Sequence, residues 1–174
     1  IGDYAFENTA IKSISIPSSV SYIGAEAFRN TKLTSVNIPA SVTEFGTGWD
    51  GGSTFRDCSK LTTVTFNASN VVPAYGFNNC GSLKTFTIGN KTTGIDNYAF
   101  SDCTTLQSIK IGENVQYIGE LAFYNTKSLK SVIGGSVISK IYKNAFQYTG
   151  LKSYSIPETV TYIDHHAFAN SSLE

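Results

Sequence analysis

Three cysteines are the side chains of this sequence best suited to redox or metal chemistry. Cys58, Cys80 and Cys103 each follow a phenylalanine by three residues, and they recur at intervals of 22 and 23 residues. Converging thiolates can form a disulfide or hold zinc, but an odd count without a Cys-x-x-Cys pair supports neither framework. Threonine or serine takes the same position elsewhere, which favours small inward side chains that hydrogen-bond a turn. We expect no metal and no cofactor, and the sequence leaves the redox state of the thiols open.

A second cluster, Asp164-His165-His166, combines a carboxylate with two imidazoles. Adjacent residues seldom point both rings at one site, so an exposed turn is the simpler interpretation. The sequence contains no nucleophile elbow, phosphate-binding loop, dinucleotide fingerprint or zinc-protease motif. We therefore expect that the protein is not an enzyme.

Charge and hydropathy exclude two classes of partner. The 174 residues carry 13 basic and 13 acidic side chains, so the basic footprint of a nucleic-acid binder is missing. No apolar run approaches the roughly 20 residues that cross a bilayer, and we expect no direct membrane insertion. The sequence lacks methionine and both begins and ends within a repeating unit, which indicates a piece cut from a longer array.

One repeating unit, shown in full by residues 95–117, organises the whole chain. A phenylalanine returns at intervals of 22 to 27 residues, at Phe6, Phe28, Phe55, Phe77, Phe100, Phe123, Phe146 and Phe168. A fixed period of this length is typical of a solenoid, in which each unit buries its apolar face against the next. Because such arrays grow by stacking, we expect residues 1–174 to form a single domain of about eight units.

After each phenylalanine, an aliphatic residue opens a short run of alternating apolar and polar residues. The inward positions of the first five runs are Ile11, Ile14, Ile16; Leu33, Val36, Ile38; Leu61, Val64, Phe66; Leu83, Phe86, Ile88; and Leu106, Ile109, Ile111. Alternation of this kind predicts a strand with one buried face. Proline or glycine follows most of the runs and ends them. We therefore expect short parallel strands.

Two units depart from this pattern. The sixth has Gly134 where the others place an inward aliphatic residue, and Ile133 then faces outward, which predicts a local register adjustment or a thinly packed layer. The third carries about five extra residues around Trp49 and Asp50, which must bulge from the coil. Trp49 is the single tryptophan, and its indole either folds back onto the solenoid or serves binding.

The pattern Ile-Gly-x-x-Ala-Phe-x-x-Cys-x-x-Leu-x-x-Ile-x-Ile-Pro, seen best in residues 23–44 and 95–117, resembles the BspA-type leucine-rich repeat family. The resemblance covers essentially the whole chain. It implies a β-rich repeat solenoid, namely a right-handed leucine-rich-repeat array with a parallel sheet on its concave face and little regular helix. That family is found on bacterial and protist cell surfaces and includes adhesins, which implies a cell-surface or secreted protein with a binding role. It transfers no catalytic residue.

The outward positions of the strands form the candidate binding site. They are rich in hydroxyls and lysines and contain no acidic residue. The central candidates are Lys84, Thr85, Thr87, Gln107, Ser108, Lys110 and Lys130. One interpretation is a mildly cationic trough for an extended polar or anionic ligand, roughly 35 Å long at about 4.8 Å per layer. The other is that threonine and serine favour strands while lysine keeps an exposed sheet soluble.

Two further features could contribute to binding. Trp49 and Asp50 mark the insertion loop, and Tyr22, Tyr117 and Tyr162 should share one edge of the coils, where their rings either bind a ligand or cover apolar surface. We expect an extracellular or cell-surface adhesion module that recognises a host or matrix protein, or a glycan, on another cell or in the extracellular matrix. The alternatives are a structural spacer and an end-to-end assembly element, the latter with weak self-association.

Overall fold

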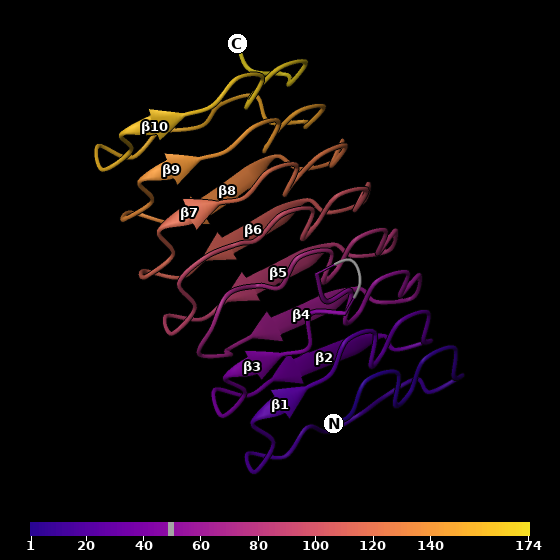
Figure 1. Cartoon of the computed structure of the whole chain (residues 1–174). Coiled ribbons are helices and arrows are strands. Elements are labelled where there is room, and N and C mark those ends of the chain that lie inside the picture. Colours follow the sequence, from indigo (N-terminus) through magenta and orange to yellow (C-terminus); the bar gives the residue numbers. More distant parts are fainter. Residues whose placement is uncertain (49–50) are drawn as a thin grey trace.

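The chain folds into a stack of parallel coils, each of which contributes one repeating unit (Figure 1). The computed structural model describes residues 1–48 and 51–174. Their strands are β1 (Tyr22–Ile23), β2 (Ser35–Ile38), β3 (Glu44–Phe45), β4 (Thr63–Phe66), β5 (Thr85–Ile88), β6 (Ser108–Ile111), β7 (Tyr117–Ile118), β8 (Ser131–Gly134), β9 (Lys140–Ile141) and β10 (Tyr162–Ile163). No helix lies in these two ranges. The expected β-rich repeat solenoid with a parallel sheet is confirmed.

The four-residue strands form one parallel sheet in the order β2-β4-β5-β6-β8. Equivalent residues of neighbouring units pair, as Val64 does with Phe86 and Thr65 with Thr87. In β2 the first and third residues are exposed, whereas the second and fourth are buried. Because successive side chains of a strand point to opposite sides, this alternation places the aliphatic residues in the core and the polar residues on the outer face.

A second ladder runs along another edge of the coils, at the apolar residue that opens each unit, such as Ile95 and Ile118, which lie five residues before the repeating phenylalanine of their units. The two-residue strand β1 pairs with β3, while β9 pairs with both β7 and β10. Between these groups, single bridges join Val72 to Ile95 and Ile95 to Ile118. From Ile23 to Ile141, the apolar residue that opens a unit is therefore a strand or bridge residue whose side chain enters the core, as for the buried Ile118, whereas Ile163 of the last unit is exposed.

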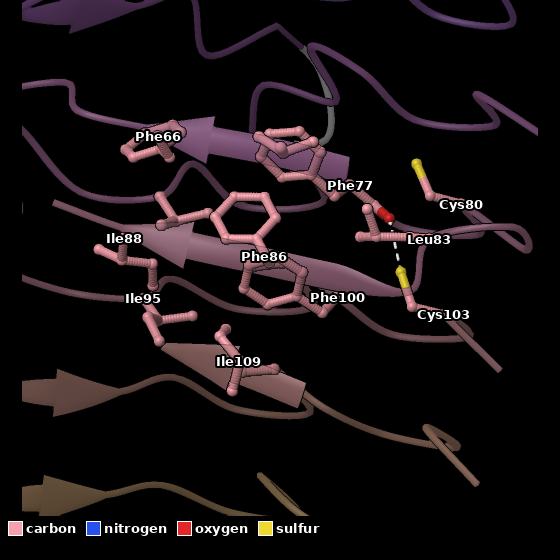
Figure 2. Close-up of a cluster of buried hydrophobic side chains, with 14 of the residues drawn as sticks. Phe66, Phe77, Cys80, Leu83, Phe86, Ile88, Ile95, Phe100, Cys103 and Ile109 are labelled. Carbon is pink, nitrogen blue, oxygen red and sulfur yellow. Dashed lines mark hydrogen bonds between the residues drawn. The ribbon is translucent and has the colours of Figure 1, made fainter. Parts of the chain in front are cut away.

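The core is a column of phenylalanine rings, one from each coil. Successive rings lie 5.0 to 5.8 Å apart between centroids, with interplanar angles of 2 to 10°. Phe86 from the sheet packs edge-on against this column, at 4.8 Å from Phe77 and 4.6 Å from Phe100 (Figure 2). Edge-to-face contact brings the positive edge of one ring to the negative face of another. Aliphatic residues of both ladders fill the remaining interior.

Each phenylalanine lies between two residues with left-handed backbone, two positions before it and two positions after it. These are Tyr4, Asn8, Glu26, Asn30, Ser53, Asp57, Tyr75, Asn79, Tyr98, Asp102, Leu121, Asn125, Asn144, Tyr148, His166 and Asn170. Asparagine or aspartate fills most of the second positions, because their short polar side chains tolerate this conformation best among non-glycine residues. The Phe77 N–H donates to Ala99 O of the next coil at 2.9 Å. The turns thus join coil to coil as a third ladder.

The first coil does not form the strand predicted for residues 11–16. Thr34 N donates to Lys12 O, but among the described residues no ladder continues along residues 13–16. Ile11 and Ile14 still pack against the core, although both are only partly buried. The alternation therefore selects the inward side chains correctly, whereas the strand itself needs a full set of backbone bonds to a neighbour.

The sixth unit keeps its register, and its packing is thin only on the side of the seventh unit. Gly134 pairs with Ile111, as the repeat requires. Its φ is +90°, and an added Cβ would lie 2.2 Å from Ile111 O, so glycine is required at this close approach. Val132 is only partly buried, and no strand forms beside β8 in the following unit, within the described part of the chain. The alternative of a register adjustment is wrong.

Candidate binding surface

The candidate site lies on the outer side of the five-stranded sheet, which we call the sheet face. It consists of the outward residues of β2, β4, β5, β6 and β8 together with the residue before each of these strands. All seven sequence-predicted residues lie here, and Lys84, Thr85, Thr87, Gln107, Lys110 and Lys130 are exposed while Ser108 is half-buried. Ladder pairing places Thr85 beside Ser108 and Thr87 beside Lys110. The repeat thus gathers residues that are up to 46 positions apart in the chain.

Lys84, Lys110 and Lys130 form a triangle on the sheet face. Gln107 N donates to Lys84 O and Lys130 N donates to Gln107 O, each at 2.9 Å. Lys84, Gln107 and Lys130 are therefore neighbours in one row across the sheet, and Lys110 of β6 lies three residues after Gln107. Strands lie about 4.8 Å apart and rise about 3.3 Å per residue, which places the three lysine backbones roughly 10 to 11 Å from one another. No carboxylate pairs with these ammonium groups among the described residues. Their charge is therefore available to a ligand.

Three more lysines extend the cationic region at the start of the strands. Lys12, Lys32 and Lys60 surround Thr34 and line a shallow depression of about 330 Å³. The outward strand positions did not include Lys32 and Lys60, because each precedes the inward leucine of its unit and therefore lies before the strand begins. The spacing from that leucine is the signal that would have found them.

A groove interrupts the sheet face beyond β8. It has a volume of about 320 Å³ and is lined by Lys130, Ser131, Val132, Gly134, Ser153, Tyr154 and Ser155. It exists because the seventh unit forms no strand beside β8, so backbone and serine side chains line the gap. Tyr154 enters from this gap and packs 5.5 Å from Phe146 and 5.7 Å from Phe168, between ring centroids. Burial raises the pKa of its phenol to about 12.

The cysteines are small inward side chains, as the sequence indicated. All three are free thiols and buried. Each thiol donates a hydrogen bond to the backbone carbonyl of the column phenylalanine in the preceding coil. Cys58 bonds to Phe28, Cys80 to Phe55 and Cys103 to Phe77, at 3.0 to 3.2 Å. Burial raises the pKa of the Cys58 thiol, and burial together with the neighbouring Cys103 raises the pKa of Cys80. A protonated buried thiol is a poor nucleophile and a poor metal ligand.

The histidine cluster lies on an exposed turn. Asp164 Oδ1 accepts from the backbone N–H of His165 at 2.7 Å and lies 2.6 Å from its ring Nδ1. These contacts, led by the backbone N–H, lower the pKa of the Asp164 carboxyl. His166 has left-handed backbone, and its ring crosses that of His165 at 71°. In residues 1–48 and 51–174, no three His, Cys, Asp or Glu side chains converge as a metal centre requires.

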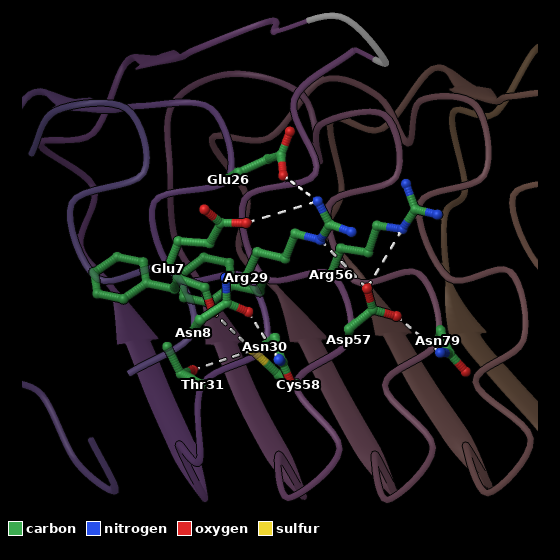
Figure 3. Close-up of polar contacts among 12 residues, drawn as sticks. Glu7, Asn8, Glu26, Arg29, Asn30, Thr31, Arg56, Asp57, Cys58 and Asn79 are labelled. Carbon is green, nitrogen blue, oxygen red and sulfur yellow. Dashed lines mark hydrogen bonds and ion pairs between the residues drawn. The ribbon is translucent and has the colours of Figure 1, made fainter. Parts of the chain in front are cut away.

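Arginine does not add to the charge of the sheet face. Arg29, which lies among the turns, reaches carboxylates of three coils, Glu7, Glu26 and Asp57 (Figure 3). Asp57 also accepts from Asn79 Nδ2 at 2.8 Å. The network joins neighbouring coils and neutralises the guanidinium within the protein.

The insertion contributes to the structure through its flanking glycines. The chain returns at Gly52, which has φ +132° and bridges to Ala74. Its carbonyl accepts from Glu26 N at 2.9 Å, so the returning chain takes its place in the turn ladder. Trp49 and Asp50, the two candidates of this loop, lie outside the described residues.

A model of the BspA-type leucine-rich repeat region matches residues 1–72 and 70–174, in six copies. The chain belongs to this family. The resemblance that the repeat motif carried is thereby confirmed. No curated protein sequence matches the chain at a significant level.

Solved structures of leucine-rich repeat proteins share the fold. A leucine rich cell surface protein from Faecalibacterium prausnitzii A2-165 is 30% identical over 89% of this chain, with a TM-score of 0.72. A leucine-rich repeat protein from Bacteroides ovatus ATCC 8483 is 25% identical over 90% of the chain, with a TM-score of 0.60. The chain spans 44% and 39% of these two proteins. A T. pallidum leucine rich repeat protein, 21% identical over 83% of this chain and 67% of its own, has a TM-score of 0.64.

No segment between residues 1 and 48 or between 51 and 174 forms a helix with the length and hydropathy that a membrane span needs.

Proposed function

We propose that this BspA-type repeat array is an extracellular or cell-surface adhesion module, and that the sheet face is its binding surface. The observation that carries the proposal is the segregation of charge. The sheet face presents lysines among hydroxyls, and no acidic residue belongs to the described positions that form it. Because the chain as a whole has equal numbers of acidic and basic residues, the acidic side chains must lie on other surfaces. We assign no catalytic role.

The chemistry of the face favours an extended polar or anionic ligand, such as an acidic segment of a matrix protein or a sulfated glycan. Hydroxyls and ammonium groups are hydrogen-bond donors, and the ammonium groups add long-range attraction. The five-stranded ladder is about 20 Å across, shorter than the length predicted from seven units, since the first and seventh units form no strand. Lys12, Lys32 and Lys60 continue the cationic strip at one end, and the groove beside Lys130 continues it at the other.

The likeness to a cell surface protein supports the location that we propose. A structural spacer would share the fold and the location, but it would have no need of a face from which acidic residues are missing. A spacer would also show no ligand whose affinity depends on the sheet face.

The test begins with a screen of matrix proteins and of neutral and sulfated glycans for binding partners. For each ligand found, K84E/K110E/K130E is compared with K91E/K127E/K140E, which makes the same change in net charge at exposed lysines outside the five-stranded sheet. We expect the first variant to lose affinity by about 100-fold or more and the second to retain most of it, with similar melting temperatures. Added salt should weaken wild-type binding. Equal effects of the two variants would contradict the proposal.

A further inference from the structure

A groove of opposite charge lies on a different part of the molecule, along the edge formed by β7, β9 and β10. Its volume is about 320 Å³, and its lining residues are Asp96, Asn97, Tyr117, Glu120, Tyr142, Lys143 and Asp164. We call it the tyrosine groove. It crosses the openings of four successive coils and includes none of the residues of the sheet face.

Glycines of the repeat make room for the rings of the groove. An added Cβ at Gly94 would lie 2.2 Å from Cε1 of Tyr117, so the ring of Tyr117 rests on the bare backbone of the neighbouring coil. Tyr142 occupies the position that follows the opening aliphatic, where Gly119 stands in the coil before it. The Tyr142 ring meets that of Tyr117 at 6.3 Å and 79°, and that of Tyr162 at 6.1 Å and 61°. The result is a short aromatic wall.

The hydroxyls of Tyr117 and Tyr142 have no hydrogen-bond partner within the described residues. Burial, followed by the charge of Asp96 and the neighbouring Tyr142, raises the pKa of the Tyr117 phenol to about 12. Like an ordinary tyrosine, it is neutral at physiological pH. The wall therefore offers neutral aromatic faces and unpaired hydroxyls.

Carboxylates dominate the rim. Asp96, Glu120 and Asp164 line the groove together with one cation, Lys143, whose Nζ lies 3.9 Å from Glu120 Oε1. A second lysine, Lys140, does not line the groove but borders an adjoining depression with Tyr142 and Tyr162. Asp96 uses Oδ1 to accept from Asn97 N, and its other oxygen has no partner among the described residues. Three carboxylates against one ammonium give the groove a net negative charge, which repels the anionic ligands suited to the sheet face and attracts cations.

We infer that the tyrosine groove is a second binding site, and that it takes the arginine side chains of an extended peptide. A guanidinium is planar, stacks on aromatic faces and pairs with carboxylates through two parallel hydrogen bonds, so it uses both the wall and the rim. The coils repeat about every 4.8 Å, while alternate side chains of an extended peptide are roughly 6.6 Å apart. The two spacings differ by about 2 Å per step, which the long arginine side chains can take up, so a peptide with arginine at alternate positions can present successive guanidinium groups to the rim.

A site of this kind would let one array hold ligands of opposite charge on two surfaces. The second site does not depend on the function proposed for the sheet face, because no residue is shared between them.

The test uses calorimetric titration with a blocked hexapeptide of alternating glycine and arginine. The comparison peptide replaces each arginine by citrulline, which keeps the shape and removes the charge. We expect binding of the arginine peptide, affinity for the citrulline peptide lower by at least about tenfold, and weakening by salt. Equal affinity for the two peptides would overturn the inference.

Two variants address the rim and the wall separately. D96N/E120Q removes two charges at nearly constant shape, and Y142G restores the residue that Gly119 provides in the preceding coil. Each should reduce affinity for the arginine peptide by about tenfold. The matched control E113Q/E158Q makes the same charge change at exposed residues outside the groove and should leave affinity within about twofold. If D96N/E120Q binds like the control while keeping the wild-type melting temperature, the groove is not the site.

K84E/K110E/K130E separates this inference from the proposed function. It should bind the arginine peptide at least as well as the wild-type protein, because its changes lie on the sheet face and add negative charge. Loss of arginine-peptide binding in this variant would place the peptide on the sheet face and refute the assignment to the groove.

Discussion

Truncating one ring in the middle of the phenylalanine column should destabilise the array strongly. Phe123 is fully buried and stacks on Phe100 at 5.1 Å and 8°, and on Phe146 at 5.1 Å and 5°. Phe123→Ala removes the apolar contact on both sides and leaves a cavity that rigid neighbouring coils cannot close. We expect a loss of about 3 to 5 kcal/mol in unfolding free energy. For a chain of this length, that corresponds to roughly 6 to 20 °C in melting temperature.

The same substitution should divide the unfolding transition. In a repeat array, stability is close to a sum of unit and interface terms, so a weak interface lets one part unfold before the other. The part after Phe123 is the weaker one, since the groove beside β8 already thins its packing. Calorimetry should therefore resolve two transitions, and hydrogen exchange should show the amide of Asp164 opening before that of Phe77, although both are bonded to a neighbouring coil.

Phe168→Ala is the matched control. This ring is half-buried and stacks on one phenylalanine, Phe146, at 5.1 Å. Its truncation should cost about 1 to 2 kcal/mol and leave a single transition. A loss at Phe123 no larger than that at Phe168, or one transition in both variants with uniform exchange, would refute the reasoning from the column.

Three further outcomes follow from particular contacts. Gly134→Ala should cost about 2 kcal/mol or more, because its Cβ would meet Ile111 O at a φ of +90°, whereas Gly81→Ala, whose Cβ meets nothing within 4 Å, should change the melting temperature little; similar melts would argue against crowding at Gly134. Cys58, Cys80 and Cys103 should resist alkylation at pH 8 in the folded protein and react at the rate of unfolding, since all three are buried; immediate labelling of the native protein would contradict this. The folded state raises the phenol pKa of Tyr117 and Tyr154 from 10.0 to about 12, so the unfolded chain loses protons first and the free energy of unfolding should fall between pH 10 and pH 12. In urea titrations of Tyr154→Phe, the free energy of unfolding should fall between pH 10 and pH 12 by about 2 kcal/mol less than in the wild-type protein. At neutral pH the variant should be as stable as the wild-type protein, because the buried hydroxyl has no hydrogen-bond partner in the described structure. An unchanged pH dependence would contradict the role of Tyr154.

Much of the candidate site could be predicted from the sequence. The alternation in Thr85-Phe86-Thr87 decides which side chains face outward, and the repeat period decides which residues of other units lie beside them. Both are properties of the one-dimensional pattern, so Lys84, Lys110 and Lys130 were placed on one face correctly. The cysteines were interpreted correctly for the same reason, since threonine at the equivalent position of other units indicated a small side chain bonded to a turn.

Only part of the tyrosine groove could be predicted from the sequence. The shared edge of Tyr117 and Tyr162 follows from the repeat, but Tyr142 occupies a glycine position and reaches the same edge from a different place in its unit. The carboxylates of Asp96, Glu120 and Asp164 come from three coils and occupy two different positions relative to the opening residue. Their convergence depends on the direction of side chains around a turn, which no periodicity specifies.

The solenoid, the phenylalanine column and the inward residues could all be predicted from the residue pattern, because burial of apolar side chains repeats with the unit. The tertiary structure decided which coils carry strands. Residues 11–16 have the right alternation and form none, while Tyr22–Ile23 lie outside the alternating runs and form β1. A strand forms only where two successive coils exchange backbone hydrogen bonds residue by residue, and this exchange is a property of the stack that no single unit encodes.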